Sequence, residues 1–141
     1  MAKYHFYHDG GHGWLKVKKA ELFKLNIADK ITPYSYQYKE WAYLEEDCDL
    51  STFFDAKGWK GTPDFWESGT IVDHYSERSK IRGYHPYQAM PYIKPKIGDI
   101  VEILGSDVKT LLLIDKNRGK DINGITYRIP SRMIGSAIRE G

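Results

Sequence analysis

The chain has 141 residues, with 21 Lys+Arg against 19 Asp+Glu, a formal net charge of +2 and one cysteine. No apolar run approaches the roughly 18 residues of a membrane span, and no charged start leads into the apolar stretch of a secretory signal. One cysteine cannot form an internal disulfide. We therefore expect a cytoplasmic protein that does not bind membranes, and the small net charge by itself does not indicate nucleic-acid binding.

The aromatic and aliphatic residues are distributed unevenly along the chain. Of the 20 aromatic residues, 19 lie in residues 1–95, whereas 15 of the 27 Ile, Leu and Val residues lie in residues 96–141. Three prolines within ten residues favour an extended connector between the two regions. We predict an aromatic-rich domain over 1–85, a proline-rich connector over 86–95 and a small β-barrel-like unit over 96–141.

Residue periodicity and turn residues predict the elements of the first domain in chain order. Strands are expected at 3–8, 14–17, 34–38, 41–45 and 70–74, helices at 18–26 and 50–57, and an ordered loop at 59–67. The glycine-rich turn after Asp9 and the Lys39-Glu40 pair indicate two hairpins. Asp49 suits the N-cap of the second helix, and Gly58 suits its end.

The second region has shorter, more regular strand signals. We expect strands at 99–104, 110–115 and 124–130, a turn at 116–119, and a last strand or helical turn at 133–139. Strands of this length and spacing are typical of a small curled sheet or an SH3-like barrel. The predicted fold class is therefore α+β: antiparallel hairpins with two short helices, followed by a small SH3-like β-barrel-type unit.

Two histidines and nearby carboxylates form the first candidate site. His8 and His12 flank the glycine-rich turn, and Asp47 belongs to the acidic run 45–49. Histidine nitrogen and carboxylate oxygen are common metal ligands, so His8, His12 and Asp47 are candidate ligands of a divalent metal. The alternative is that these residues only form turns and cap the helix at Asp49. Apart from this metal, no cofactor is expected.

Cys48 lies within the same acidic run. Neighbouring carboxylates disfavour a thiolate, so the residue is a poor nucleophile, and we expect a small buried side chain.

Basic and aromatic side chains form the second candidate site. Cations can hold phosphates, and tyrosine rings can stack on nucleobases. The candidate ligand-binding residues are Tyr34, Tyr36, Tyr38, Arg78, Lys80, Arg82 and Tyr84. The alternative for the three-tyrosine stripe is that it belongs to the core or to an interface, and for the cations that they are ordinary surface charge.

The strings HDGGHGWL, YSY and YLEEDCD together resemble uncharacterised small proteins of bacteriophages and prophages. The resemblance covers roughly residues 5–85. It implies a phage or mobile-element context and a host-cell cytoplasmic location, and it carries no catalytic residue over to this chain. In that context we expect a protein that binds a host protein or a small signalling ligand to counter a host defence system.

Three functions follow from these patterns. The first is a non-enzymatic binding protein, because tyrosine and tryptophan give large contact areas at low entropic cost. The alternatives are a nucleotide or nucleic-acid binding protein and a metal-dependent hydrolase. Homo-oligomer formation stays open.

Overall fold

The computed structural model describes residues 4–59 and 70–138. The chain divides into two compact units, each treated separately below. Unit 1 comprises Met1–Gln37 and Trp41–Met90, and unit 2 comprises Tyr38–Glu40 and Pro91–Gly141. The break after Met90 falls within the proline-rich range 86–95. Within the described ranges, no helix is long and apolar enough to cross a membrane.

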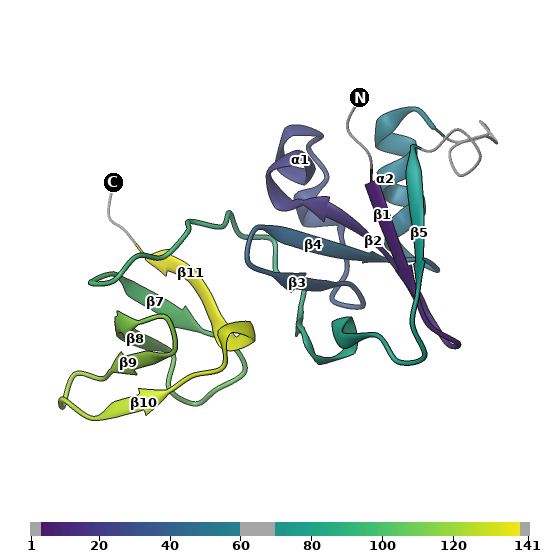
Figure 1. The fold of residues 1–141 in the computed structure, drawn as a ribbon. Coiled ribbons are helices and arrows are strands. Elements are labelled where there is room, and N and C mark those ends of the chain that lie inside the picture. The colour runs from purple at the N-terminus through teal and green to yellow at the C-terminus, as the bar shows by residue number, and fades with distance from the viewer. Residues whose placement is uncertain (1–3, 60–69, 139–141) are drawn as a thin grey trace. The chain divides into compact units, whose positions relative to one another are not determined.

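A six-stranded sheet with the order β5-β1-β2-β4-β3-β6 forms the framework of unit 1 (Figure 1). Its strands are β1 Tyr4–His8, β2 Gly13–Lys18, β3 Tyr36–Tyr38, β4 Trp41–Glu45, β5 Ile71–Tyr75 and β6 His85–Pro86. The hairpin of β1 and β2 is antiparallel, and β3 neighbours β4, as the sequence predicted. The sequence did not predict that β5 pairs with β1 in parallel. Such a pair requires a long connection, which local patterns do not reveal.

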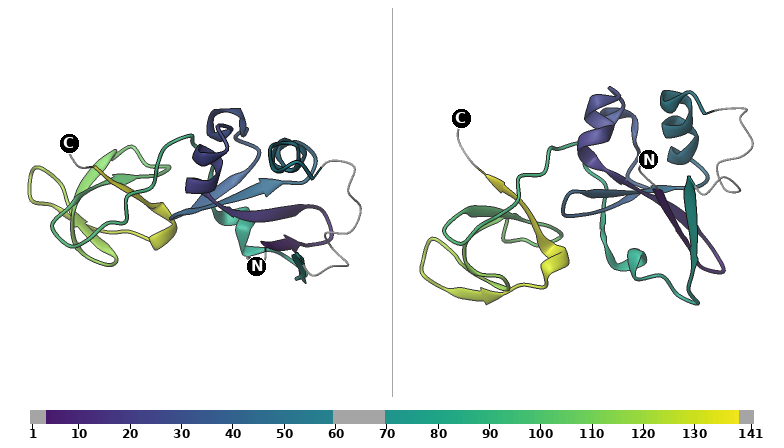
Figure 2. Two further views of the ribbon diagram at one scale, coloured as in Figure 1. Left: turned by 90° about the horizontal axis from the view of Figure 1, so that it is seen from above. Right: turned by 45° about the horizontal axis from the view of Figure 1, so that its top comes forward.

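Alternation along the strands gives the sheet two different faces. Leu15 and Leu44 are opposite each other on β2 and β4 and are fully buried in the main core. The same core contains Leu22 of helix α1 (Lys19–Lys24) and Phe53 of helix α2 (Asp49–Lys57). Both helices lie on one side of the strands in the left view of Figure 2. The neighbouring residues of these strands therefore point to the opposite face.

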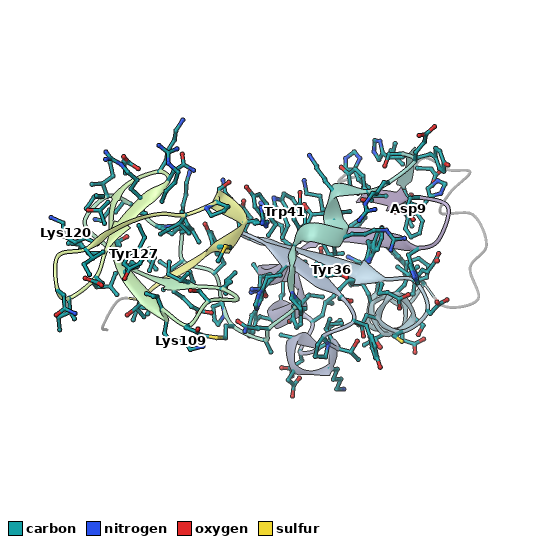
Figure 3. The ribbon with its side chains drawn as sticks, turned by 90° about the horizontal axis from the view of Figure 1, so that it is seen from below. Asp9, Tyr36, Trp41, Lys109, Lys120 and Tyr127 are labelled. Carbon is teal, nitrogen blue, oxygen red and sulfur yellow. The ribbon has the colours of Figure 1, made fainter. Side chains whose placement is uncertain are left out.

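The opposite face is partly covered by a short 3₁₀ helix, Lys80–Gly83. Ser79 accepts a hydrogen bond from the backbone N–H of Ile81, and Ile81 is buried. Figure 3 views unit 1 from this side and labels Asp9 and Tyr36. This face, rather than the helical one, carries the candidate functional site.

The first helix is shorter than predicted, because α1 covers Lys19–Lys24 rather than 18–26, and Asn26, with φ 64°, lies beyond its end. Gly58, with φ 73°, ends α2 in the left-handed conformation, as its sequence signal indicated. Asp49 does not cap α2, because Cys48 is the N-cap residue and makes no side-chain capping bond. The Asp49 carboxylate instead accepts hydrogen bonds from Thr32 and Ser35.

The polar residues buried beside this core were not predicted. Gln37 alternates with the tyrosines of β3 and is buried. Its Oε1 accepts hydrogen bonds from Lys19 Nζ at 3.0 Å and from the backbone N–H of Gln88 at 2.8 Å. Buried polar groups require such partners, so this strand is fixed by polar contacts as well as by its rings.

Unit 2 contains a five-stranded sheet with the order β10-β9-β8-β7-β11. Its strands are β7 Ile100–Ile103, β8 Thr110–Asp115, β9 Arg118–Lys120, β10 Thr126–Arg128 and β11 Ile134–Ile138. Val101, Leu111 and Ile129 are among its buried core residues. In the described residues the outer strands β10 and β11 are not paired with each other, so the predicted closed SH3-like barrel stays a prediction.

Strand β9 was predicted as part of a turn, since Gly119 follows turn-forming residues. A Cβ atom on Gly119 would lie 2.8 Å from Leu111 Cβ. The glycine therefore lets β9 pack closely over the core, and the turn is confined to the residues before it. The loop predicted for 59–67 lies outside the described residues from residue 60 onward.

Candidate functional site

Unit 1 contains a pocket of about 360 Å³, called here the Trp14 pocket. It is lined by His12, Trp14, Tyr34, Tyr36, Glu45, Asp47, Cys48 and Arg82. Trp14 and Glu45 are directly opposite each other on β2 and β4, so their side chains share a face of the sheet. That face is the one opposite Leu15 and Leu44. The pocket therefore lies on the side of the sheet opposite its main core, and it extends to Cys48 just before α2.

The carboxylate of Asp9 organises the turn at one end of this pocket. Its Oδ1 accepts hydrogen bonds from the backbone N–H groups of Gly11 and His12, at 3.0 and 3.1 Å. The Asp9 N–H donates to the carbonyl of His12 at 3.0 Å, which closes the turn. These bonds fix the backbone of His12, whose side chain reaches the pocket.

The same carboxylate binds the segment that covers the sheet. Its two oxygens accept hydrogen bonds from Arg82 Nε and Nη2, both at 2.7 Å, and Oδ2 also accepts one from the backbone N–H of Ser79. Arg82, then the backbone donors of Gly11 and Ser79, hold the pKa of Asp9 well below its usual range. Asp9 is therefore a structural anion and not a candidate metal ligand.

Trp14 forms the floor of the pocket and is 2 % exposed. The guanidinium carbon of Arg82 lies 5.4 Å from the centre of its ring, and the Tyr36 ring packs edge-on at 6.2 Å. Among the buried side-chain polar atoms of residues 4–59 and 70–138, Trp14 Nε1 is the one without a hydrogen-bond partner. Such buried donors are rare because each carries the full cost of desolvation.

The end of the pocket near His12 is acidic. Glu45 Oε1 lies 4.0 Å from His12 Nδ1, and one ligand atom each of His12, Glu45 and Asp47 lie within 4.8 Å of one another. Glu45 Oε2 accepts hydrogen bonds from the backbone N–H groups of Asp47 and Cys48, both at 3.0 Å. The turn after β4 thus fixes the buried carboxylate and presents its second oxygen to His12.

Of the predicted metal ligands, the structure brings together His12 and Asp47 but not His8. His8 Nε2 instead contacts Asp73 Oδ2 at 2.8 Å, across the parallel pair of β1 and β5. Side chains of successive strand residues point to opposite faces, and the chain changes direction in the turn between His8 and His12. The two imidazoles are therefore not brought together. Glu45, which belongs to the acidic run 45–49, completes the cluster in place of His8.

Of the predicted ligand-binding residues, some line the Trp14 pocket and others do not. The pocket contains Tyr34, Tyr36 and Arg82. Tyr38 belongs to unit 2, where its hydroxyl donates to Ser131 Oγ at 3.2 Å. The remaining predicted residues lie outside the pocket lining: Arg78 and Lys80 are exposed, and Tyr84 packs against Tyr43 with ring centres 5.2 Å apart.

Cys48 was expected to be buried, but it is exposed at the edge of the pocket. Partial desolvation and the Glu45 carboxylate raise the pKa of its thiol, so the thiolate is disfavoured as the sequence predicted. This position is a poor one for a nucleophile.

Sequence reasoning missed Trp14 as a site residue. It lies two positions after His12, just inside β2, and the centres of the two rings are 6.1 Å apart. That local signal was available in the sequence. The pairing of β2 with β4, which adds Glu45, depends on tertiary structure.

Unit 2 has a pocket of its own, of about 370 Å³, called here the lysine pocket. Lys39, Lys94 and Lys116 line it together with Tyr92, Pro95, Leu113, Asn117, Ser131 and Ile134. Burial raises the pKa of Tyr92 to about 12, so its hydroxyl is protonated at neutral pH. Three ammonium groups around a pocket favour an anionic ligand.

Comparison of the chain with protein-family models, with curated proteins and with solved structures finds no match. The resemblance to phage-type proteins therefore stays a prediction, and the function is argued from the geometry of the site.

Proposed function

We propose that this chain is a non-enzymatic binding protein that takes a small planar ligand into the Trp14 pocket. The observation that carries the proposal is the pocket of about 360 Å³, which brings the Trp14, Tyr34 and Tyr36 rings together in its lining. Trp14 Nε1–H is itself buried and has no acceptor among the described residues, so a small movement of the indole toward the pocket would let an acceptor of the ligand satisfy this donor. The raised pKa of Cys48 disfavours its thiolate, which also supports binding rather than nucleophilic catalysis.

The other residues that line the Trp14 pocket indicate which class of ligand it would bind. The rings of Tyr36 and the exposed Tyr34 offer stacking surfaces for a flat heterocycle, and such stacking contributes about 1–3 kcal/mol per base in nucleobase complexes. Arg82 is already paired with Asp9, whereas Glu45 and Asp47 have no such cation beside them in the pocket lining. In metal-free solution the pocket should therefore prefer neutral heterocycles to anionic ones.

The test is isothermal titration of the full chain with adenosine, guanosine, cytidine and uridine, in buffer containing a chelator. We expect at least one nucleoside to bind with 1:1 stoichiometry and its 5′-monophosphate to bind more weakly. Trp14→Phe keeps an aromatic side chain but removes the indole N–H, so it should weaken binding by roughly tenfold, the effect of about 1.4 kcal/mol. Trp41→Phe, outside the pocket lining, is the matched control. Failure of all four nucleosides to bind would contradict this proposal.

Under the resemblance to phage-type proteins, we further propose that the chain acts in the cytoplasm of a host cell. Sequestering a small signalling ligand there would counter a host defence system. In this proposal unit 2 is an SH3-like unit that contacts a host protein.

The lysine pocket favours a second candidate function, the binding of a phosphate-bearing ligand such as a nucleotide. Its three lysines make the binding electrostatic, so affinity for AMP should fall steeply as salt rises from 50 to 200 mM. Lys116→Ala should weaken AMP binding severalfold, whereas Lys109→Ala, outside the lining of this pocket, should not. An affinity that does not change with salt would contradict this candidate.

A further inference from the structure

The acidic end of the Trp14 pocket has the composition of a metal site. His12 contributes an imidazole nitrogen, and Glu45 and Asp47 each contribute a carboxylate oxygen. Imidazole with carboxylates suits divalent transition metals such as Zn²⁺ better than Mg²⁺ or Ca²⁺, which prefer oxygen alone.

The distances are close to those of a coordination sphere. Bonds of about 2.0–2.2 Å place two ligand atoms of a tetrahedral ion roughly 3.4 Å apart. His12 Nδ1 and Glu45 Oε1 are 4.0 Å apart, and the set lies within 4.8 Å. The imidazole of His12 is 48 % exposed and Asp47 is also exposed. Small rotations of these two side chains close the sphere around a fixed Glu45.

Glu45 is the fixed member because its environment leaves it little freedom. Its side chain is 10 % exposed, and Oε2 is held by the N–H groups of Asp47 and Cys48. This is how metal-ligating carboxylates are generally oriented, with hydrogen bonds to the atoms that do not bind the ion. The turn around Asp9 holds His12 in the same manner, through its backbone.

The charge of the pocket also fits a cation. Among the described lining residues, Arg82 is the one permanently cationic side chain, and its partner Asp9 neutralises it. The two carboxylates of Glu45 and Asp47 are therefore left to attract a divalent ion.

Trp14 lines the same pocket as the three candidate ligands. It is buried and carries the Nε1–H that has no partner among the described residues. An ion with three protein ligands keeps open positions for water or another oxygen ligand.

From this geometry we propose that His12, Glu45 and Asp47 bind one divalent transition-metal ion of the Zn²⁺ type. The ion would have three protein ligands, with its remaining positions facing the pocket. The proposal goes beyond the binding of an organic ligand and stands without it, because the metal alone is the ligand tested.

The test is titration of the full chain, purified without a histidine tag and treated with chelator, with ZnCl₂ as the probe. A competing chromophoric chelator reports the affinity. We expect one Zn²⁺ per chain and weaker binding of Mg²⁺. His12→Gln and Asp47→Asn should each lower the Zn²⁺ affinity at least tenfold. Both side chains are exposed, so both variants should keep the far-UV circular dichroism of the wild type.

The matched control is His8→Gln, because His8 lies at the other side of the same turn but contacts Asp73. It should leave the Zn²⁺ affinity unchanged. In addition, Zn²⁺ should raise the melting temperature of the wild type but not that of Asp47→Asn. The proposal is overturned if the wild type binds no stoichiometric Zn²⁺, if His12→Gln binds as tightly as the wild type, or if His8→Gln loses as much affinity as His12→Gln.

Discussion

The carboxylate of Asp9 accepts hydrogen bonds from Nε and Nη2 of Arg82, both at 2.7 Å, although the two residues are 73 positions apart. This pair joins the turn after β1 to the 3₁₀ helix that covers the polar face of the sheet. It holds His12 and Arg82 at the pocket, so the geometry of the candidate site depends on it.

The first prediction concerns this pair. Asp9→Asn removes the charge that Arg82 and the backbone N–H groups of the turn require, and it should lower the melting temperature by roughly 5 °C or more. The matched change Asp73→Asn affects a carboxylate that is 57 % exposed, and it should shift the midpoint by about 1 °C at most. Thermal unfolding followed by circular dichroism compares them. Equal shifts in the two variants would mean that Asp9 does not organise the turn.

The second prediction concerns the glycine at the start of β2. A Cβ atom on Gly13 would overlap the Phe6 ring, so Gly13→Ala should destabilise the fold by about 1–3 kcal/mol. A Cβ atom on Gly10, in the same turn, meets nothing within 4 Å. Gly10→Ala should therefore change stability by less than about 0.5 kcal/mol. Urea denaturation of both variants measures the difference, and a tolerated Gly13→Ala would show that the Phe6 contact is loose.

The third prediction concerns the buried carboxylate of Asp49. It accepts hydrogen bonds from the N–H and hydroxyl of Thr32 and from the hydroxyl of Ser35. Asp49→Asn replaces one acceptor by a donor and should cost about 2–3 kcal/mol in the free energy of unfolding. Asp107→Asn, at an exposed position of unit 2, should cost less than about 0.5 kcal/mol. If the two changes cost the same, the hydrogen bonds of Asp49 do not stabilise the fold.

These features separate what local sequence could predict from what it could not. The hairpin of β1 and β2 and the end of α2 at Gly58 follow from alternation and from residues that adopt particular backbone angles. His12 and Asp47 were identified by their chemistry. The interactions of Asp9 with Arg82 and of Asp49 with Thr32 were not predictable, because each joins segments far apart in the chain.

The parallel pairing of β1 with β5 is a further long-range feature, and it explains why His8 was assigned to the wrong group. Local alternation correctly placed His8 on a strand, but the neighbouring strand supplies its partner, Asp73. The sequence thus indicated that His8 could form a polar contact, whereas the identity of its partner depended on the topology of the sheet.

The fourth prediction concerns stability at high pH. Tyr87 is buried and its hydroxyl donates to the carbonyl of Ala28 at 2.7 Å. Burial, then the carboxylates of Asp49 and Asp29, raise the pKa of Tyr87 to about 12. The fold therefore favours the neutral phenol. Its contribution is fully present below pH 10, the ordinary value, and is lost as pH rises through 12.

Between pH 9.5 and pH 12 the wild type should therefore lose about 2 kcal/mol more stability than Tyr87→Phe, which has no phenol to ionise. Guanidinium denaturation at several pH values measures this difference. Parallel curves for the two proteins would show that the Tyr87 hydroxyl does not titrate with folding.

The central claim is that the Trp14 pocket is the place where a ligand binds. The most direct test is a ¹H–¹⁵N spectrum of the tryptophan indole groups during titration with each of the four ribonucleosides, with the Trp14 peak assigned through Trp14→Phe. We predict a saturable shift of the Trp14 Nε1–H peak with at least one nucleoside, while the Trp41 peak stays in place. A Trp14 peak that does not move at millimolar nucleoside, or that moves no more than the Trp41 peak, would contradict the account.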